Sequence, residues 1–188
     1  AISRVLAYLV GTVDKALTVP RAKGNRLDFY VDSDHAGWRK FGDSRSRSGI
    51  IFLCNSMPFH WRSTKQPETA MSSAAAEIVA MSECIKDMNL RIWIAEEIGI
   101  RISYPADIKV DNTACINFQK HMNPGTKLKG IFDLRSKWIK EMQDIGRFIA
   151  VKVDTTKNLA DELTKPLSAA TRRLLESELE RIKKLTTS

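Results

Sequence analysis

The clearest hydrophobic pattern in the chain lies in residues 27–34, Leu-Asp-Phe-Tyr-Val-Asp-Ser-Asp. Apolar and polar side chains alternate over the first six of these residues, which predicts a β-strand with one buried face. The segment then closes on two acids, Asp32 and Asp34. An aspartate often begins a turn, but a carboxylate beside a packed strand also needs a cation or hydrogen-bond donors in place of its lost water. The pattern alone leaves both interpretations open.

Changes of periodicity along the rest of the chain predict a mixture of strands and helices. Runs of β-branched and aromatic residues indicate strands, and apolar residues that recur at steps of three and four indicate helices. A serine before a run of alanines caps the longest helix at Ser72, and Gly99 ends it. The elements predicted after the first strand are a hairpin over 48–54 and 57–62, the helix from 72 to 99, a strand over 107–110, a helix opening at 113, a helix over 131–144, a strand over 148–153, and helices over 158–163 and 168–185.

This order of elements predicts the fold class. An antiparallel start followed by alternating strands and helices is typical of an α/β fold in which helices pack against a mixed sheet. A length of 188 residues suits one domain with a sizeable core. Residues 1–19 hold a short apolar helix that is too short to fold alone. We expect it to pack on the following elements or to belong to a preceding domain.

Composition indicates the cellular compartment of the protein. Its three cysteines, Cys54, Cys84 and Cys115, have no spacing suited to zinc or redox chemistry, which predicts reduced structural thiols inside a cell. No apolar run approaches the roughly 20 residues that span a bilayer, and the N-terminus has no signal-peptide pattern. We therefore expect a soluble intracellular protein without a membrane partner.

The net charge of +8 is concentrated in two blocks. Residues 35–70 hold six Lys or Arg against two acids, and residues 119–152 hold eight against three. Blocks of this kind suit a polyanionic partner such as a nucleic acid. A solvated basic surface without a partner is the alternative.

Four acids share a similar sequence context. Asp32 and Asp111 follow predicted strands, whereas Glu77 and Asp161 lie in early helical turns. Neighbouring strands of one sheet would bring the two aspartates together, and helices leaving that edge would add the other two. Clustered carboxylates repel one another unless divalent cations bind among them, and Mg²⁺ prefers oxygen ligands and bridges phosphates. The spacing permits such a cluster without establishing it.

Six segments carry a further signal: YVDSDHAG at 30–37, SRSG at 46–49, WRSTKQ at 61–66, SSAAAE at 72–77, VDNTA at 110–114 and LADELTKP at 159–166. In this order they resemble the ribonuclease H domain of copia-type (Pseudoviridae) LTR retrotransposon Pol polyproteins, and the resemblance runs over residues 26–167. RVLAYLVGT at 4–12 also resembles the end of the reverse transcriptase that precedes this domain.

The resemblance implies a ribonuclease H-like fold, a mixed five-stranded sheet flanked by helices. It divides the chain into a reverse-transcriptase remnant (1–24), a ribonuclease H domain (25–167) and a C-terminal helical tail (168–188). The implied activity is cleavage of the RNA strand of RNA–DNA hybrids during reverse transcription, by hydrolysis with two Mg²⁺ ions that Mn²⁺ can replace.

The family's functional residues can be carried over to matching positions. The implied catalytic residues and metal ligands are Asp32, Glu77, Asp111 and Asp161, with Asp34 as the alternative to Asp32. Glu77 is expected to hold one ion and to approach the ribose of the hybrid, whose 2′-hydroxyl marks the strand to be cut.

One motif departs from the family pattern. Copia-type domains commonly have Lys-His-Ile-Asp where this chain reads Lys-Gly-Ile-Phe-Asp at 129–133, and a later histidine is also absent near Lys137. Related enzymes use a mobile histidine there to assist proton transfer or product release. His121 in the adjoining loop is the candidate replacement, and the alternative is that it is merely a solvated side chain.

Substrate contacts are predicted from cations and polar groups near the motifs, because such groups hold phosphates without reading sequence. Trp61 is predicted to lie in the core, and Trp38 is either a core or a stacking residue. The predicted nucleic-acid-binding residues are Arg45, Arg47, Ser48, Arg62, Lys65, Ser73, Asn112, Lys127 and Lys129.

The implied partners are an RNA–DNA hybrid and the reverse transcriptase of the same polyprotein, in a cytoplasmic virus-like particle or the nucleus. Two alternatives stay open. The first is a catalytically weak or inactive module that binds nucleic acid or supports a polymerase. The second is another nuclease or transferase of the same fold, such as a strand-transfer enzyme, a class that usually relies on three acids.

Overall fold

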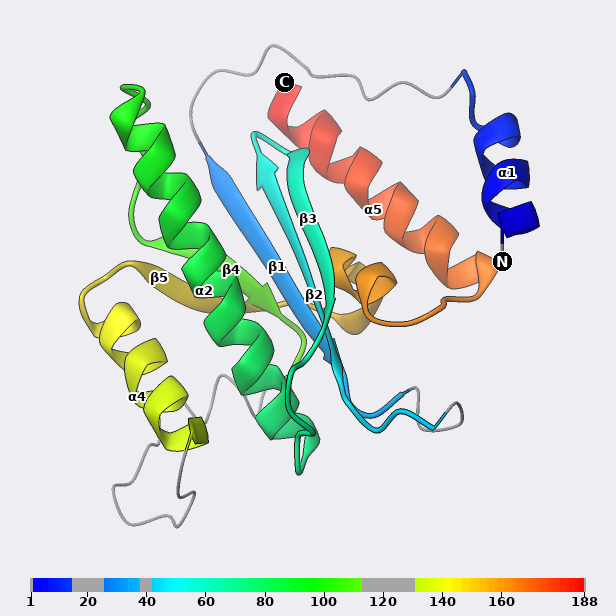
Figure 1. Cartoon of the computed structure of the whole chain (residues 1–188). Coiled ribbons are helices and arrows are strands. Elements are labelled where there is room, and N and C mark those ends of the chain that lie inside the picture. Colours follow the sequence, from blue (N-terminus) through cyan, green and yellow to red (C-terminus); the bar gives the residue numbers. More distant parts are fainter. Residues whose placement is uncertain (1, 15–25, 38–41, 113–130, 188) are drawn as a thin grey trace.

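The structure, a computed structural model, describes residues 2–14, 26–37, 42–112 and 131–187. Its centre is a five-stranded sheet in the order β3-β2-β1-β4-β5 (Figure 1). The strands are β1 (Leu27–Asp34), β2 (Arg47–Cys54), β3 (Met57–Lys65), β4 (Ala106–Val110) and β5 (Phe148–Lys152). The helices are α1 (Ile2–Gly11), α2 (Ser73–Glu97), α4 (Ile131–Asp144) and α5 (Ala169–Thr187), with short 3₁₀ helices η2 (Thr155–Lys157) and η3 (Leu159–Leu163).

The first three strands form an antiparallel meander, and the predicted hairpin is confirmed. Its two-residue turn has positive φ angles at both central positions, 47° at Asn55 and 68° at Ser56. This turn geometry matches the right-handed twist of the flanking strands, and asparagine adopts it readily. The second strand of the hairpin, β3, continues beyond residue 62 to Lys65. It is an edge strand of the sheet, because only β2 pairs with it in the strand order.

The other half of the sheet is parallel. β4 pairs with β1, with Asp28 opposite Asp107 and Tyr30 opposite Lys109, and β5 pairs with β4. Parallel strands place their carboxyl ends at the same edge of a sheet. The predicted mixed sheet is therefore confirmed, and β1, β4 and β5 all end on one side.

The long helix α2 begins and ends as predicted. The Ser72 side chain accepts a hydrogen bond from the Ala75 backbone N–H at 3.1 Å and so caps the first turn. At the other end Gly99 has a φ of +82°, a conformation that favours glycine. The helix is thus fixed at both termini by local sequence.

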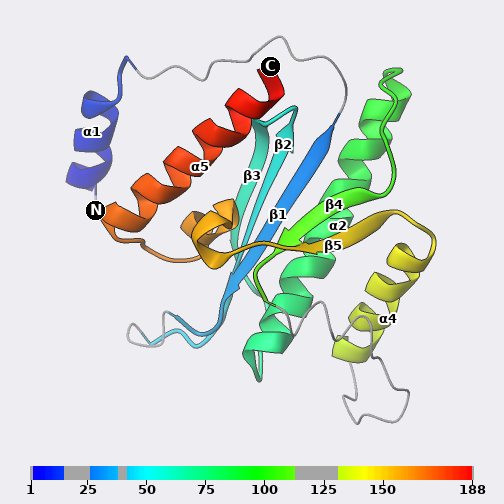
Figure 2. The same cartoon turned by 180° about the vertical axis from the view of Figure 1, so that it is seen from behind.

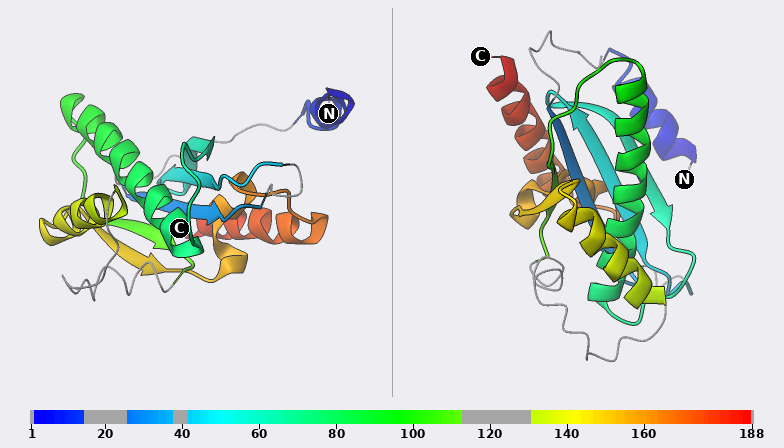
Figure 3. Two further views of the ribbon diagram at one scale, coloured as in Figure 1. Left: turned by 60° about the horizontal axis from the view of Figure 1, so that its bottom comes forward. Right: turned by 90° about the vertical axis from the view of Figure 1, so that its left-hand side faces the viewer.

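Helices cover both faces of the sheet. α2 and α4 lie on one face (Figure 3) and enclose the larger core, in which Phe29, Phe52 and Ile108 contact Met81, Ile85 and Ile139. η3 and α5 lie on the other face (Figure 2), where Tyr30, Leu53 and Leu159 pack with Leu175. The terminal segment is therefore a packed helix rather than a free tail.

Two predictions about burial are wrong. β1 was predicted to have one buried face, but residues 28–32 are all buried, because η3 and α5 cover the face that was expected to meet water. Trp61 was predicted to lie in the core, yet its side chain is 59% exposed. It lies on the edge strand β3, where exposure alternates along the strand and the covering elements do not reach.

The apolar face of the N-terminal helix α1 is not packed on the following elements, which was the first of the two alternatives. Its apolar side chains Val5, Leu6 and Leu9 are each more than half exposed, at 58%, 57% and 55%. The second alternative, a preceding domain, stays a prediction. Within the described segments, no helix combines the length and apolar character needed to cross a membrane.

Candidate active site

Two of the predicted site acids lie at neighbouring strand ends. Asp32 is near the carboxyl end of β1, and Asp111 directly follows β4. Continuing the parallel register by two residues beyond the pair Tyr30–Lys109 brings Asp32 level with Asp111. Asp32 is buried, whereas Asp111 is half-buried. The predicted meeting of two strand-end aspartates is thus what the sheet topology produces.

Glu77 reaches the same place from α2. It lies in the second turn of the helix, and its residue exposure is only 7%. The pKa of Glu77 is raised to about 8, chiefly by burial and in part by the charges of Asp32 and Asp111, while the neighbouring Ser33 and Asn112 side chains partly offset the rise. Glu77 is therefore an acid whose ionised form is poorly compensated by the protein alone.

Asp161 enters from η3, which is held tightly against β1. Asn158 caps η3 by accepting from the Ala160 N–H at 3.2 Å, and its side-chain amide donates to the Val31 carbonyl at 3.1 Å. Thr164 at the end of η3 donates to Asp32 Oδ2 at 2.8 Å. These bonds fix Asp161, which is 3% exposed, beside the end of β1.

The pKa of Asp32 is raised by burial and in part by the neighbouring acids. It is raised to about 6, chiefly by burial and in part by the charges of Asp111 and Asp161, while the hydrogen bond from Thr164 and the charge of Lys165 oppose the rise. The four predicted acids thus act on one another electrostatically, although they come from four different elements. A cluster of carboxylates that act on one another in this way is expected at a site that binds a cation.

The chemistry of this donor set fits a hard divalent cation. Carboxylate oxygens are the preferred ligands of Mg²⁺, and the raised pKa values of Asp32 and Glu77 are an electrostatic cost that a cation would remove. Among the described residues, no three acidic, histidine or cysteine side chains already enclose a space for a metal ion.

Lys165 is a site residue that sequence reasoning missed. Its Nζ lies 2.5 Å from Asp161 Oδ1. Burial lowers the pKa of Lys165, but the contact with Asp161 outweighs that effect, and Asp32 and Asp34 add to the rise. The available signal was its spacing of four residues from Asp161, which places two side chains on one side of a helical turn. Asp34, the alternative ligand, ends β1 and is half-buried.

The predicted phosphate-binding cations are mostly engaged with acids. Lys65 and Arg45 both pair with Asp43, the latter at 3.5 Å. Arg62 lies 3.1 Å from Asp87 and 3.6 Å from Glu83. A phosphate would have to compete with these carboxylates.

The remaining predicted contacts differ in accessibility. Arg47 donates to Ser63 at 3.2 Å and is half-buried. Ser48 is buried, and its hydroxyl accepts from the Gln66 amide at 2.9 Å, so its side chain lies inside the fold. Ser73 is exposed at the start of α2, and Asn112 is half-buried beside Glu77. Lys127, Lys129, His121, Trp38, Cys115 and the helix predicted from residue 113 lie outside the described residues.

Retrotransposon polyproteins are similar to this chain over most of its length. The Retrovirus-related Pol polyprotein from transposon RE2 of Arabidopsis thaliana is 33% identical over 172 residues, and that from transposon TNT 1-94 of Nicotiana tabacum is 31% identical over 172 residues. The alignments cover 89% and 88% of this chain but 11% and 12% of the polyproteins. The chain therefore spans about a tenth of the length of these relatives. No protein-family profile matches it.

Comparison with solved structures identifies the fold independently of the sequence relatives. LC11-RNase H1, isolated from compost by a metagenomic approach, aligns with a TM-score of 0.55 over 82% of this chain and 99% of its own, at 16% identity. The same protein in complex with an RNA/DNA hybrid aligns with a TM-score of 0.54 over 74% of this chain and 94% of its own, at 15% identity. The sequence relatives of this chain are thus copia-type retrotransposon Pol polyproteins, and its fold is that of ribonuclease H.

Proposed function

We propose that the chain is a magnesium-dependent endoribonuclease that cleaves the RNA strand of RNA–DNA hybrids during reverse transcription. The observation that carries the proposal is the convergence of Asp32, Glu77, Asp111 and Asp161 at one edge of the sheet, where their charges act on one another. The Pol polyprotein relatives and the RNA/DNA hybrid bound by LC11-RNase H1 support the choice of substrate.

The four acids would hold the cations, two Mg²⁺ ions that Mn²⁺ can replace. When bound, these ions supply Lewis-acid stabilisation at the scissile phosphate. Other residues of the protein position the carboxylates and balance their charge. Thr164 orients Asp32 by its hydrogen bond, and Lys165 balances the charge of Asp161. Ser33 and Asn112 lie beside Glu77 and favour its ionised form.

Binding of the hybrid would rest on phosphate contacts near this edge. Ser73 is exposed at the start of α2, and Arg45 and Lys65 could exchange Asp43 for phosphate oxygens. In our proposal the reverse transcriptase of the same polyprotein supplies the hybrid, within a cell. Residues 25–167 would form the catalytic unit, and α5 completes its packing.

The decisive experiment compares cleavage of labelled substrates. We expect cutting of an RNA–DNA hybrid, but not of duplex RNA or duplex DNA, only when Mg²⁺ is present. Glu77→Gln and Asp111→Asn should each reduce the rate at least about 100-fold, because each removes a charged ligand. Asp144→Asn makes the same chemical change on α4, where the acid is 60% exposed, and should leave the rate unchanged. Absence of metal-dependent hybrid cleavage would refute the proposal.

One observation favours a second candidate function, in which the domain binds nucleic acid without cleaving it. Lys165 already pairs with Asp161, so one proposed ligand is neutralised by the protein itself. Hybrid binding measured beside cleavage separates the two functions. Tight binding with no cleavage in either Mg²⁺ or Mn²⁺ would support the binding module.

A further inference from the structure

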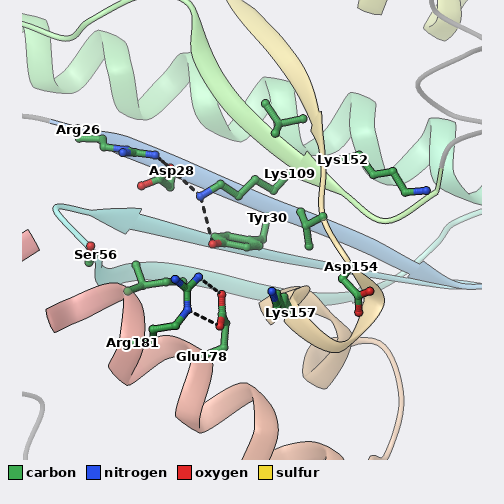
Figure 4. Close-up of a pocket in the computed structure, with 13 residues that line it drawn as sticks. Arg26, Asp28, Tyr30, Ser56, Lys109, Lys152, Asp154, Lys157, Glu178 and Arg181 are labelled. Carbon is green, nitrogen blue, oxygen red and sulfur yellow. Dashed lines mark hydrogen bonds and ion pairs between the residues drawn. The ribbon is translucent and has the colours of Figure 1, made fainter. Parts of the chain in front are cut away.

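A cavity of about 500 Å³ lies between the sheet and α5 (Figure 4). Asp28 and Tyr30 of β1 and Lys109 of β4 line the sheet side, and Glu178 and Arg181 line the α5 side. None of the four proposed metal ligands contributes to its lining. The cavity is therefore separate from the candidate active site, although Tyr30 is only two residues from Asp32.

The lining carries a surplus of positive charge. Five cationic side chains face three carboxylates, which leaves two positive charges in excess. The cations are Arg26, Lys109, Lys152, Lys157 and Arg181, and the acids are Asp28, Asp154 and Glu178.

The acids in the cavity already have partners. Asp28, which is 2% exposed, accepts from Lys109 at 2.8 Å and from Arg26 at 3.1 Å. Glu178 accepts two hydrogen bonds from Arg181, at 2.6 and 2.8 Å (Figure 4). Asp154 accepts from the Thr156 N–H at 2.9 Å. These carboxylates need no further cation.

Several donors have capacity left. Within the described part of the chain, the side chains of Lys152 and Lys157 form no hydrogen bond or ion pair and are exposed on the rim. The pKa of Asp154 is lowered chiefly by its hydrogen bonds from Thr156 and in part by the charges of these two lysines. Lys109 uses its ammonium on Asp28 and, at 3.2 Å, on the Tyr30 oxygen. The Tyr30 hydroxyl carries a proton that it can donate in turn. Donors from the sheet and from the rim thus face one space.

We infer that this cavity binds a phosphomonoester: inorganic phosphate, a mononucleotide or the terminal phosphate of an oligonucleotide. A phosphomonoester carries a charge of about −1.5 to −2 at pH 7, which matches the surplus, whereas an internal phosphodiester carries about −1. The volume falls within the range of about 300–1,000 Å³ found for small-molecule sites. A recessed site admits a chain end but excludes the internal backbone of a duplex.

The test is a calorimetric titration of the full chain in EDTA at constant ionic strength, so that the acidic cluster cannot recruit phosphate through a cation. The probes are inorganic phosphate, AMP, and one trinucleotide with and without a 5′-phosphate. We expect saturable binding of inorganic phosphate, AMP and the 5′-phosphorylated trinucleotide. The unphosphorylated trinucleotide should bind at least about tenfold more weakly, because it lacks the charge-assisted hydrogen bonds of a terminal phosphate.

Two variants assign the site. Lys157→Gln leaves no carboxylate unpaired and should weaken phosphate binding at least about tenfold. Tyr30→Phe keeps the ring under Lys109 and removes only the hydroxyl, so it should weaken binding severalfold. Lys140→Gln on α4 is the matched control and should bind like the unchanged protein.

Two outcomes overturn the inference. One is the absence of saturable binding of every phosphorylated probe, and the other is equal binding of the two trinucleotides, which would indicate a general polyanion surface. Hybrid cleavage measured on the same Lys157→Gln sample should be unchanged, because Lys157 is outside the proposed active site. The inference and the proposed function therefore fail or succeed separately.

Discussion

The ionisation of Glu77 depends strongly on its surroundings. Its pKa is raised to about 8, chiefly by burial and in part by Asp32 and Asp111, while Ser33 and Asn112 partly oppose the rise. A folded-state pKa above the unfolded value means that the folded protein binds more protons than the unfolded chain at neutral pH. Ionising Glu77 without a cation therefore costs free energy of folding.

This cost predicts the pH dependence of stability in EDTA. Stability should fall as the pH rises through the pKa of Glu77, by at most about 1.4 kcal/mol per pH unit. The fall runs from the unfolded value of 4.5 up to about 8. We expect it to be read most clearly between about pH 6.5 and 8, because His60, whose pKa is lowered chiefly by burial, changes stability in the opposite direction only below about 6.5. Thermal unfolding followed by circular dichroism measures it.

Controls for this prediction use the same acid and a remote one. Glu77→Gln should flatten the curve in that interval, and Mg²⁺ should reduce the fall for the unchanged protein. Asp144→Asn should leave the curve as it is, because that side chain is exposed on α4. A flat or rising curve for the unchanged protein in EDTA would show that Glu77 ionises without cost.

The individual site residues differ in how far sequence could predict them. The positions of Asp32, Glu77 and Asp111 at strand ends and in an early helical turn could be predicted from local periodicity, whereas their assignment as ligands rests on the family resemblance and stays a prediction. The Thr164–Asp32 bond could not be predicted, because its partners lie 132 residues apart and meet only when η3 docks on β1. Ser48 was expected to face substrate and instead bonds Gln66 inside the fold, a contact that depends on the register of β2 and β3.

At the scale of elements, the close approach of η3 to β2 controls the geometry of the site. A Cβ atom added at Gly49 of β2 would lie 2.6 Å from the Ala160 carbonyl oxygen and 2.8 Å from Thr164 Cγ2. Backbone on one side and a packed side chain on the other leave it no space. Glycine at this position therefore lets η3 lie directly on the sheet.

Gly49→Ala should push η3 outward and displace Asp161 and Thr164 from Asp32. We expect a loss of about 1–3 kcal/mol in the free energy of unfolding, which is typical of overpacking, together with a severalfold loss of hybrid cleavage. Urea unfolding and cleavage kinetics measure the two effects. In the matched change Gly11→Ala, the added methyl meets nothing within 4 Å, so both quantities should stay the same. Unchanged stability of Gly49→Ala would mean that η3 adapts freely.

Whole elements were predicted where their signals are local. The serine cap and the terminal glycine define α2, and the Asn55-Ser56 turn defines the hairpin. The double burial of β1 was not predicted, because it depends on α5, whose apolar stripe gives no sign of which face it will cover. The exposure of Trp61 likewise follows from the edge position of β3, a property of the whole sheet.

At the scale of the whole molecule, the net charge of +8 should dominate encounters with nucleic acid. Each neutralised phosphate contributes about −0.7 to −0.9 to the slope of log affinity against log salt. With two or more such contacts, hybrid affinity should fall about tenfold between 50 and 200 mM salt. Fluorescence anisotropy of a labelled hybrid in EDTA, without cleavage, measures this slope.

The matched control for the salt dependence is a duplex of the same charge and length. Duplex DNA should show a similar slope if phosphate contacts alone dominate, since these contacts do not read sequence. Salt-independent affinity for the hybrid would exclude the two basic blocks as its binding surface.

The long-range bonds to β1 also set the time at which the site appears during synthesis. Thr164 reaches back 132 residues to Asp32, and Lys109 reaches back 81 residues to Asp28. Contacts between such distant segments close late, because ordering a long loop costs entropy before the contact forms, whereas the β2–β3 hairpin can form locally. A nascent chain therefore lacks Asp161, the fourth of the proposed ligands, beside the other three until η3 has left the ribosome and docked.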